Sequence, residues 1–441
     1  MTGVLFALLI TLLSGYFVVS IIDREMELRF RLLFSIPMGF AVSSVFYFLY
    51  QCLNLYNFQD FKWFELIAVI VLALVYFNHE KPEIAKHKFK KLSNWFYVVN
   101  IYALAIFLKY FINNPMGSWD GFRIWNIKAE FLYLQSPLWK NVFHLPHFMS
   151  HCDYPLFLPA SVARLWQYAG HQWFWANLAM GLLFTFGLVY LLYQAICYFK
   201  SEKAAAVVCT VFMISDIFLV NGAAQCADIP LAMFFLNSIV CLFFYFKNKR
   251  FTTFLLSIIF AGASVWVKNE GLMFLAVYTL VMLCWFVANK RNKKTLITAA
   301  IAAIFAACAI LYKKFAGAPN DLVYGFLEVK SYTFAFDLHR YLVVLQTFLT
   351  LMFGKFVLFL SLAILAIKGF KIKEKFKNSF ALSLAILLFM IAGYLAVYIL
   401  SPHDINWLTE NSMERIILQI LPVFVFLFSI TLRIGKPDSI N

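Results

Sequence analysis

The sequence is poor in charged residues. Asp, Glu, Lys and Arg make up only 13% of its 441 residues, whereas hydrophobic residues make up 63%. A soluble globular protein carries about 25% charged residues, so the composition excludes an ordinary soluble protein and predicts an all-α protein that crosses a membrane many times. An internal repeat and a low-complexity tract are also lacking. The first apolar run has neither a basic start nor a small-residue cleavage site, so we expect it to remain as a helix and not to act as a cleaved signal peptide.

Apolar runs recur along the whole chain. A helix needs about 20 apolar residues to span roughly 30 Å of hydrocarbon. About thirteen runs approach that length, which predicts a bundle of about 13 transmembrane helices. The runs lie near residues 3–22, 33–56, 63–77, 95–112, 173–199, 204–221, 228–246, 252–267, 271–288, 295–312, 341–366, 380–400 and 414–433.

The net charge of +15 is distributed unevenly. Lys and Arg gather in every second loop, which is the positive-inside pattern of membrane proteins. This pattern predicts an N-terminus outside and a C-terminus in the cytoplasm of the inner (plasma) membrane. The basic residues are therefore expected to meet the lipid bilayer, and the pattern argues against binding of nucleic acid. The basic loops hold Arg24 to Arg31, Lys81 to Lys91, Lys200 and Lys203, Lys247 to Arg250, Lys290 to Lys294, Lys368 to Lys377, and Arg433 with Lys436.

The predicted outer loops carry the acids, histidines and aromatic residues. The largest, residues 113–172, is rich in Trp, Tyr and Phe. Its apolar periodicity predicts two amphipathic helices, near 124–134 and 158–169, that lie on the membrane surface. Two of the eight cysteines, Cys152 and Cys226, also fall in outer loops, where a disulfide between them is one alternative.

Three carboxylates in these loops are candidate catalytic groups. Asp120 stands where a membrane helix ends and the first surface helix begins, which suits either a helix cap or a general base at the membrane–water boundary. Asp228 lies at the start of another membrane helix, and capping is again the structural alternative. Asp153 precedes a Tyr-Pro pair, so its alternative role is that of a turn residue.

Cations on the same side are candidate phosphate-binding groups. Lys268 and Glu270 lie in the turn "WVKNEGLMF", where Lys268 either binds an anionic headgroup or snorkels at the interface. Arg415 lies at the outer mouth of the last helix, against the positive-inside bias. It therefore either binds phosphate or pairs with Glu410 or Glu414.

Five more residues of the first outer loop suit the interface or a metal. Arg123 and Lys128 suit lipid headgroups. His144, His147 and His151 are candidate ligands of a divalent metal, although a proline interrupts their spacing. We expect no cofactor and keep a metal as the alternative.

Five motifs in order resemble the bacterial GT-C glycosyltransferases. They are "SWDGFRIWNIKAEFL", "HCDYPLFLP", "ADIPLA", "VKNEGL" and "NSMERIILQILP", each on the predicted outer side. The chain looks most like the family 39 branch that includes the protein O-mannosyltransferases and the aminoarabinose transferase. The resemblance covers residues 95–290 and the region of Arg415.

The resemblance implies an enzyme that takes a sugar from a polyprenyl-phosphate donor. Such enzymes transfer the sugar, with inversion, to a lipid, glycan or protein acceptor outside the cytoplasmic membrane. The implied GT-C-like bundle has an N-terminal three-helix membrane segment at 1–94, a catalytic membrane module at 95–312 and a C-terminal membrane segment at 313–441. The implied roles are an acceptor base for Asp120, a second acid for Asp228, and donor-phosphate binding for Lys268 and Arg415.

The sequence departs from the family at two places. Many relatives have Tyr before the "AD" pair, whereas Cys226 and Ala227 precede Asp228 here. Close relatives have a basic residue and a proline where this chain has Asp153 and Tyr154. A phosphate-binding role therefore does not transfer to that loop, and Asp153 is a candidate second acid.

Other readings compete with glycosyl transfer. A transporter or flippase of lipid-linked sugars is expected to show polar residues near the bilayer midplane, often in repeats. An O-antigen-ligase or polymerase-like enzyme is expected to rely on outer Arg and His and not on paired Asp. A non-enzymatic assembly protein is the third alternative.

Overall fold

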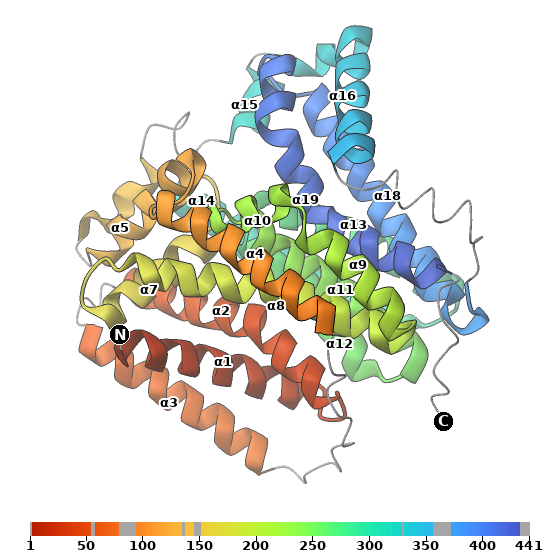
Figure 1. Cartoon of the computed structure of the whole chain (residues 1–441). Helices are drawn as coiled ribbons and strands as arrows, with labels where there is room; N and C mark the ends of the chain where they lie inside the picture. The colour runs from red at the N-terminus through yellow and green to blue at the C-terminus, as the bar shows by residue number, and fades with distance from the viewer. Residues whose placement is uncertain are drawn as a thin grey trace.

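The computed structural model of the chain describes residues 2–53, 58–78, 94–134, 137–144, 151–318, 320–328, 330–355 and 372–432. These residues form helices joined by turns, and no strand occurs among them (Figure 1). The prediction of an all-α protein is confirmed for this part of the chain.

The helices follow one another closely along the chain. The first half contains α1 (Thr2–Ile22), α2 (Leu28–Cys52), α3 (Phe58–Phe77), α4 (Asn94–Asn113), α5 (Ile127–Tyr133), α7 (Phe157–Ala169), α8 (Phe174–Phe199), α9 (Glu202–Met213) and α10 (Asp216–Ala223). The second half contains α11 (Asp228–Asn248), α12 (Phe251–Ala263), α13 (Asn269–Ala288), α14 (Asn292–Ala316), α15 (Asp321–Leu327), α16 (Leu338–Thr350), α18 (Lys377–Ile399) and α19 (Ile405–Thr431).

The described residues include nine helices that are long and apolar enough to cross a membrane, or ten if α9 and α10, which meet at 67°, form one broken span. The chain is therefore a multi-pass membrane protein. The count of about thirteen is not confirmed. Among the other predicted runs, α3 carries three charged residues in its first eight positions, and α12 has only 13 residues. The run at 341–366 extends beyond the described residues.

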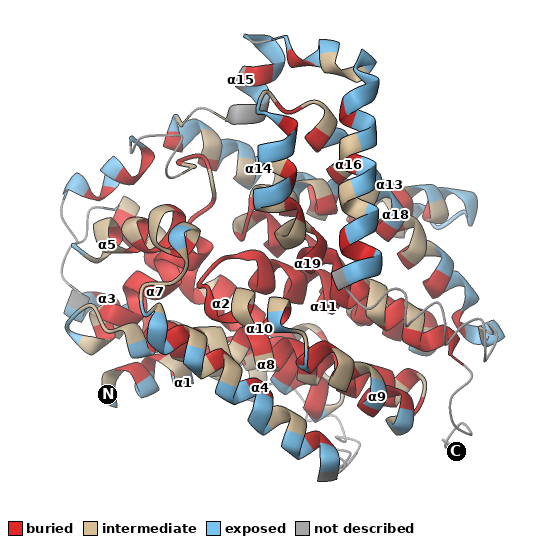
Figure 2. Ribbon diagram, turned by 45° about the horizontal axis from the view of Figure 1, so that its top comes forward, coloured by how far each residue is buried: buried red, intermediate tan, exposed pale blue. Residues whose placement is uncertain are grey.

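Helix α11 forms the centre of the bundle. Every residue of its most apolar stretch is buried, against 17% for α14 at the periphery. It packs against α8, α12 and α19, and Figure 2 shows it almost wholly in the colour of buried residues. A helix that is apolar on all sides is expected in such a position.

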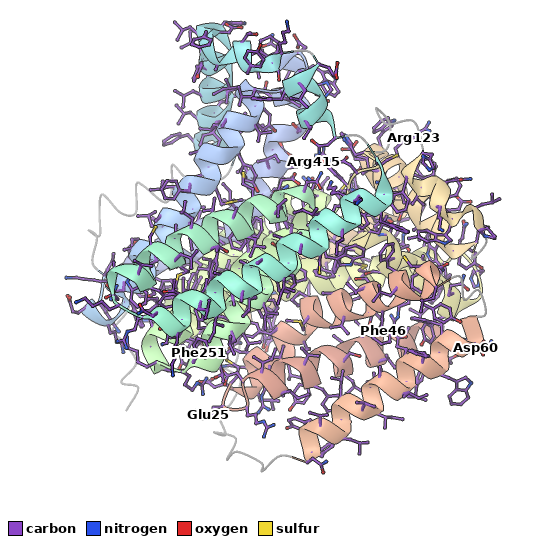
Figure 3. The ribbon with its side chains drawn as sticks, turned by 180° about the vertical axis from the view of Figure 1, so that it is seen from behind. Glu25, Phe46, Asp60, Arg123, Phe251 and Arg415 are labelled. Atoms are coloured by element: carbon purple, nitrogen blue, oxygen red, sulfur yellow. The ribbon has the colours of Figure 1, made fainter. Side chains whose placement is uncertain are left out.

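The two ends of the bundle carry different polar groups. At one end, α4 ends and α11 and α13 begin. The loop after α4 contacts the loop before α11, and Lys268, just before α13, pairs with Asp228 at the start of α11. At the other end, Arg29 of α2 donates to Gln194 of α8 at 3.1 Å, and Arg250 pairs with Asp23 at 3.2 Å. Figure 3 labels Arg415 near the first end, and Glu25 and Phe251 near the second. Helices α15 and α16 stand above the first end in Figure 1.

The helices of the first large loop form where the sequence predicts them. A six-residue π-helix (Gly121–Asn126) leads into α5, and α7 spans Phe157–Ala169. The prediction that both lie on the membrane surface is wrong for α7, because eleven of its thirteen residues are buried. It packs against α1, α2 and α5. A buried ion pair between Arg164 of α7 and Glu65 of α3, with N–O distances of 2.8 and 2.9 Å, draws this helix into the protein.

Candidate functional site

The corner before the π-helix places Asp120 at the polar end of the bundle. The Ser118 hydroxyl oxygen accepts a hydrogen bond from the Gly121 amide at 3.1 Å, so Ser118 caps this helix start. The Asp120 side chain makes no capping hydrogen bond and instead pairs with Arg415 of α19. The capping interpretation of Asp120 is therefore wrong.

Backbone contacts fix this corner against the loop before α11. The Ser118 amide donates to the Ala224 carbonyl at 3.1 Å. Gly117 has a φ of +86°, and a Cβ atom added at Gly121 would lie 2.2 Å from the same carbonyl oxygen. Only glycine permits so close an approach of two backbones. The two loops that carry Asp120 and Asp228 are thus brought together.

Three buried amide side chains strengthen the junction. Asn126 and Asn177 each donate to the Gln225 side-chain oxygen at 2.7 Å. Gln225 in turn donates to the Pro115 carbonyl at 2.9 Å. Buried polar groups that satisfy one another in this way make a junction rigid.

Asp228, Lys268 and Glu270 form the buried part of the site. The Lys268 ammonium lies 2.9 Å from Asp228 Oδ1 and 2.8 Å from Glu270 Oε1. Gln419 of α19 donates to Asp228 Oδ1 at 2.6 Å, and Tyr394 of α18 donates to the Gln419 oxygen at 2.6 Å. Burial alone would lower the pKa of Lys268, but the two carboxylates raise it well above its usual range, so the ammonium stays charged.

This geometry settles two structural alternatives. Ala227, and not Asp228, occupies the N-cap position of α11, and the Asp228 side chain accepts from Lys268 and Gln419. Lys268 is buried in the ion pairs, so it does not snorkel to the interface.

Asp120 and Arg415 form the more accessible part of the site. Their side chains are 22% and 25% exposed, against 2% and 8% for Asp228 and Lys268. Arg415 pairs with Asp120, which lies in a distant part of the sequence. Sequence reasoning considered only the nearby Glu410 and Glu414 as partners of Arg415.

Asp153 joins three segments of the chain. Its Oδ2 accepts from Lys313 at 3.0 Å, from Asn269 at 2.6 Å and from Asn320 at 2.6 Å. Burial by itself raises the pKa of Asp153, but Lys313 and the amide donors hold it below its usual value. The carboxylate is therefore ionised and its Oδ2 atom is fully engaged, which favours an anchoring role.

Tyr154 forms an aromatic wall beside these charges. It stacks on Trp125 at 5.6 Å and on His151 at 5.0 Å between ring centroids. The Lys268 ammonium lies 5.6 Å from its ring centroid. Lys128, buried behind the wall, donates to the His151 carbonyl at 2.7 Å, and burial lowers its pKa to about 8. Lys128 therefore supports the loop and does not meet lipid headgroups.

The remaining candidates lie apart from these groups. Arg123 is half-buried over the ring of Phe122 at 5.8 Å, and it makes no ion pair with any described residue. His147 lies outside the described residues, and His151 stacks on Tyr154. No group of three or more His, Cys, Asp or Glu side chains in the described ranges is arranged to hold a metal.

The two loop cysteines do not form a disulfide. Cys152 and Cys226 are both buried and neither is disulfide-bonded, and Cys226 lies 3.6 Å from the Ser118 hydroxyl. The disulfide alternative is therefore wrong. Burial raises the pKa of the Cys226 thiol to about 11, so it stays protonated.

Sequence reasoning missed several residues of the site. Lys313 offered a signal, because it ends a membrane helix on the same side as Arg415 and so also opposes the positive-inside pattern. Gln419, a polar residue within an apolar run, offered another. The others, Tyr154, Asn269, Asn320 and Tyr394, are of types too common at helix ends and interfaces to be identified from sequence.

We call the assembled charges the acid–base cluster. It consists of Asp120, Asp153, Asp228, Glu270, Lys128, Lys268, Lys313 and Arg415. The four carboxylates balance the four cations, so the cluster has no formal net charge. Such an arrangement can remove a proton with a carboxylate and stabilise an anion with a cation a short distance away.

No protein-family model matches the chain, and comparisons with curated proteins and with solved structures also found no match.

Proposed function

We propose that the protein is a membrane glycosyltransferase that moves a sugar from a polyprenyl-phosphate donor to an acceptor at the outer face of the cytoplasmic membrane. The observation that carries the proposal is the meeting of Asp120, Asp228, Lys268 and Arg415 at one end of the bundle. These residues come from three loops and the last helix, and the motif resemblance assigns them complementary roles.

Asp120 is the proposed base. An acceptor hydroxyl attacks the anomeric carbon of the sugar while the bond from that carbon to the phosphate oxygen breaks. The hydroxyl proton passes to the Asp120 carboxylate, and the sugar is transferred with inversion. Asp120 suits this role because it lies at a fixed corner and is partly exposed.

Arg415 is the proposed partner of the leaving phosphate. The donor phosphodiester carries one negative charge, and the released polyprenyl phosphate carries up to two. A cation that meets this growing charge lowers the barrier. The Arg415 guanidinium is accessible and forms an ion pair with Asp120, so it lies next to the proposed base. Lys268 lies deeper in the protein, where it pairs with Asp228 and Glu270 and holds these two carboxylates in place.

The position of the charges favours an enzyme over a transporter. A carrier of lipid-linked sugars is expected to place its polar groups near the midplane, at the breaks of discontinuous helices. Here Asp228 and Glu270 lie in the first turns of α11 and α13. The positive-inside pattern assigns this end of the bundle to the outer face.

A transfer assay tests the proposal. Proteoliposomes with the purified protein receive a polyprenyl-phosphate hexose with a radiolabelled sugar and an envelope extract as acceptor. We expect label to move from the lipid fraction into the extract, and polyprenyl phosphate to accumulate in equal amount. Intact donor that crosses the bilayer without loss of its sugar would instead identify a flippase.

A further inference from the structure

Glu270 has a carboxylate oxygen that the protein does not use. Its Oε1 receives Lys268 at 2.8 Å and the Gln419 amide at 3.5 Å. Its Oε2 is buried and has no hydrogen-bond partner among the described residues. A buried acceptor without a donor is costly, so it calls for a partner such as a bound molecule or an ordered water.

The hydroxyl groups of the neighbouring tyrosines Tyr394 and Tyr398 form hydrogen bonds with other residues and not with Glu270 Oε2. Tyr394 donates to Gln419, which fixes the Gln419 amide nitrogen toward the carboxylates. The Tyr398 hydroxyl shares a hydrogen bond of 2.7 Å with Ser412. Oε2 therefore has no protein donor among the described residues, and the Glu270 side chain as a whole is 16% exposed.

The surroundings combine a carboxylate with aromatic rings. The Tyr154 ring centroid lies 5.6 Å from the Lys268 ammonium, and Tyr394 is linked to Glu270 through Gln419. A sugar ring presents an apolar face of C–H groups and a rim of hydroxyls. Tyrosine rings match the face, and a carboxylate oxygen accepts from the rim.

We propose that Glu270 Oε2 accepts a hydrogen bond from a hydroxyl of the donor's sugar. The inference rests on the proposed function and assigns the sugar end of the donor to α13, α18 and α19. A neutral hydroxyl fits better than an ammonium group, because the four cations of the acid–base cluster already balance its four carboxylates. Glu270 is then a residue that determines which sugars bind.

The test compares two lipids that differ only in the sugar. The probes are C55 polyprenyl phosphate and the same lipid with glucose, mannose, galactose or glucosamine, bound to purified protein in detergent. The measured quantity is the ratio of the Kd for the bare lipid to the Kd for the glycosylated lipid. We expect wild type to favour at least one neutral sugar by about tenfold or more, as for a hydrogen bond to a charged group.

Two Glu270 variants and one control complete the design. Glu270→Ala is expected to bring the ratio to about one, whatever its effect on the affinity for bare lipid. Glu270→Gln can still bond a hydroxyl, so we expect it to keep part of the preference. Glu410→Ala removes an exposed carboxylate from α19 and is expected to leave the ratio unchanged.

Each outcome has a separate meaning. If wild type binds no polyprenyl phosphate, the proposed function fails and the inference fails with it. If wild type prefers a sugar and Glu270→Ala keeps that preference, or if wild type shows no preference, the inference alone is overturned, and Oε2 then bonds only water. If the preferred sugar is glucosamine and Glu270→Gln abolishes its binding, the group is an ammonium and the hydroxyl assignment is wrong.

Discussion

Arg415 and Lys268 have the same charge but different environments. Lys268 is surrounded by two carboxylates and the Tyr154 ring and is 8% exposed. Arg415 is 25% exposed and pairs with Asp120 at the edge of the site. Sequence reasoning gave them the same role, because burial cannot be read from a single residue in a turn.

The two cations are therefore expected to respond differently to replacement by alanine. Arg415→Ala should weaken binding of a polyprenyl-phosphate sugar by about 10- to 100-fold, the value of a charged hydrogen bond, with little change in thermal midpoint. Lys268→Ala should also lower the midpoint clearly, because it leaves Asp228 and Glu270 buried without their cation. Donor binding and thermal unfolding in detergent measure both effects. Unchanged donor affinity in Arg415→Ala would remove that residue from the phosphate site.

Asp153 predicts a dependence of stability on pH. Its pKa in the folded protein is held below the unfolded value of about 3.9. Its contribution to stability is therefore present above that value and is lost as the pH falls toward the folded pKa. We expect the thermal midpoint of wild type to fall between about pH 5 and pH 3. Asp153→Asn should melt lower at neutral pH and fall less over this range, and parallel curves for the two proteins would contradict the assignment.

At the scale of elements, the close contact between the corner at 117–121 and the loop before α11 sets the geometry of the site. Gly121→Ala would bring a Cβ atom to 2.2 Å from the Ala224 carbonyl oxygen, so the corner must move and carry Asp120 with it. A shift of about 1 Å can cost roughly 100-fold in rate, and we expect a loss of that order in the transfer assay. Gly354→Ala is the control, because no atom lies within 4 Å of its added Cβ. Full activity in Gly121→Ala would show that this contact does not position Asp120.

The ion pair between Glu65 and Arg164 joins α3 to α7. Both side chains are almost fully buried, at 4% and 1% exposure, and Tyr168 donates to the same carboxylate at 2.8 Å. Glu65→Ala should cost about 3–5 kcal/mol, because it leaves a buried guanidinium unpaired. The double variant Glu65→Leu with Arg164→Met should cost less than Glu65→Ala.

Thermal unfolding measures these differences against an exposed pair. Glu374 and Lys377 are 83% and 59% exposed, so Glu374→Ala should change stability by less than about 1 kcal/mol. An equal effect of Glu65→Ala and Glu374→Ala would contradict the structural role of the buried pair.

The sequence predicted many elements correctly for physical reasons. Apolar runs located the spans, and the periodicity of residues 158–169 located α7, because burial imposes both patterns. The same periodicity could not reveal that α7 is buried on nearly all sides. Arg164 suggests a solvent-exposed face in the sequence, and only the structure shows that Glu65 of α3 pairs with it. Long-range partners such as Asp153 with Lys313 leave no local signal.

At the scale of the whole molecule, charge separates the two ends of the bundle. The acid–base cluster lies at one end, and Arg29 and Arg250 with their partners lie at the other. The alternation of loops along the sequence predicted that Asp120, Asp228, Lys268 and Arg415 share one side, and the fold places them at one end. That shared location connects the sequence motifs to a single proposed reaction.

The most direct measurement is mass spectrometry of envelope lipids, glycans and proteins from cells that carry the wild-type protein or Asp120→Asn. Asp404→Asn is the matched control, because Asp404 only caps the start of α19, where it accepts from the Trp407 amide at 2.9 Å. If Asp120 is the base, one envelope component loses a sugar in Asp120→Asn, and the polyprenyl-phosphate sugar accumulates. The control keeps the wild-type profile. Full modification of every envelope component in Asp120→Asn would contradict the proposed reaction.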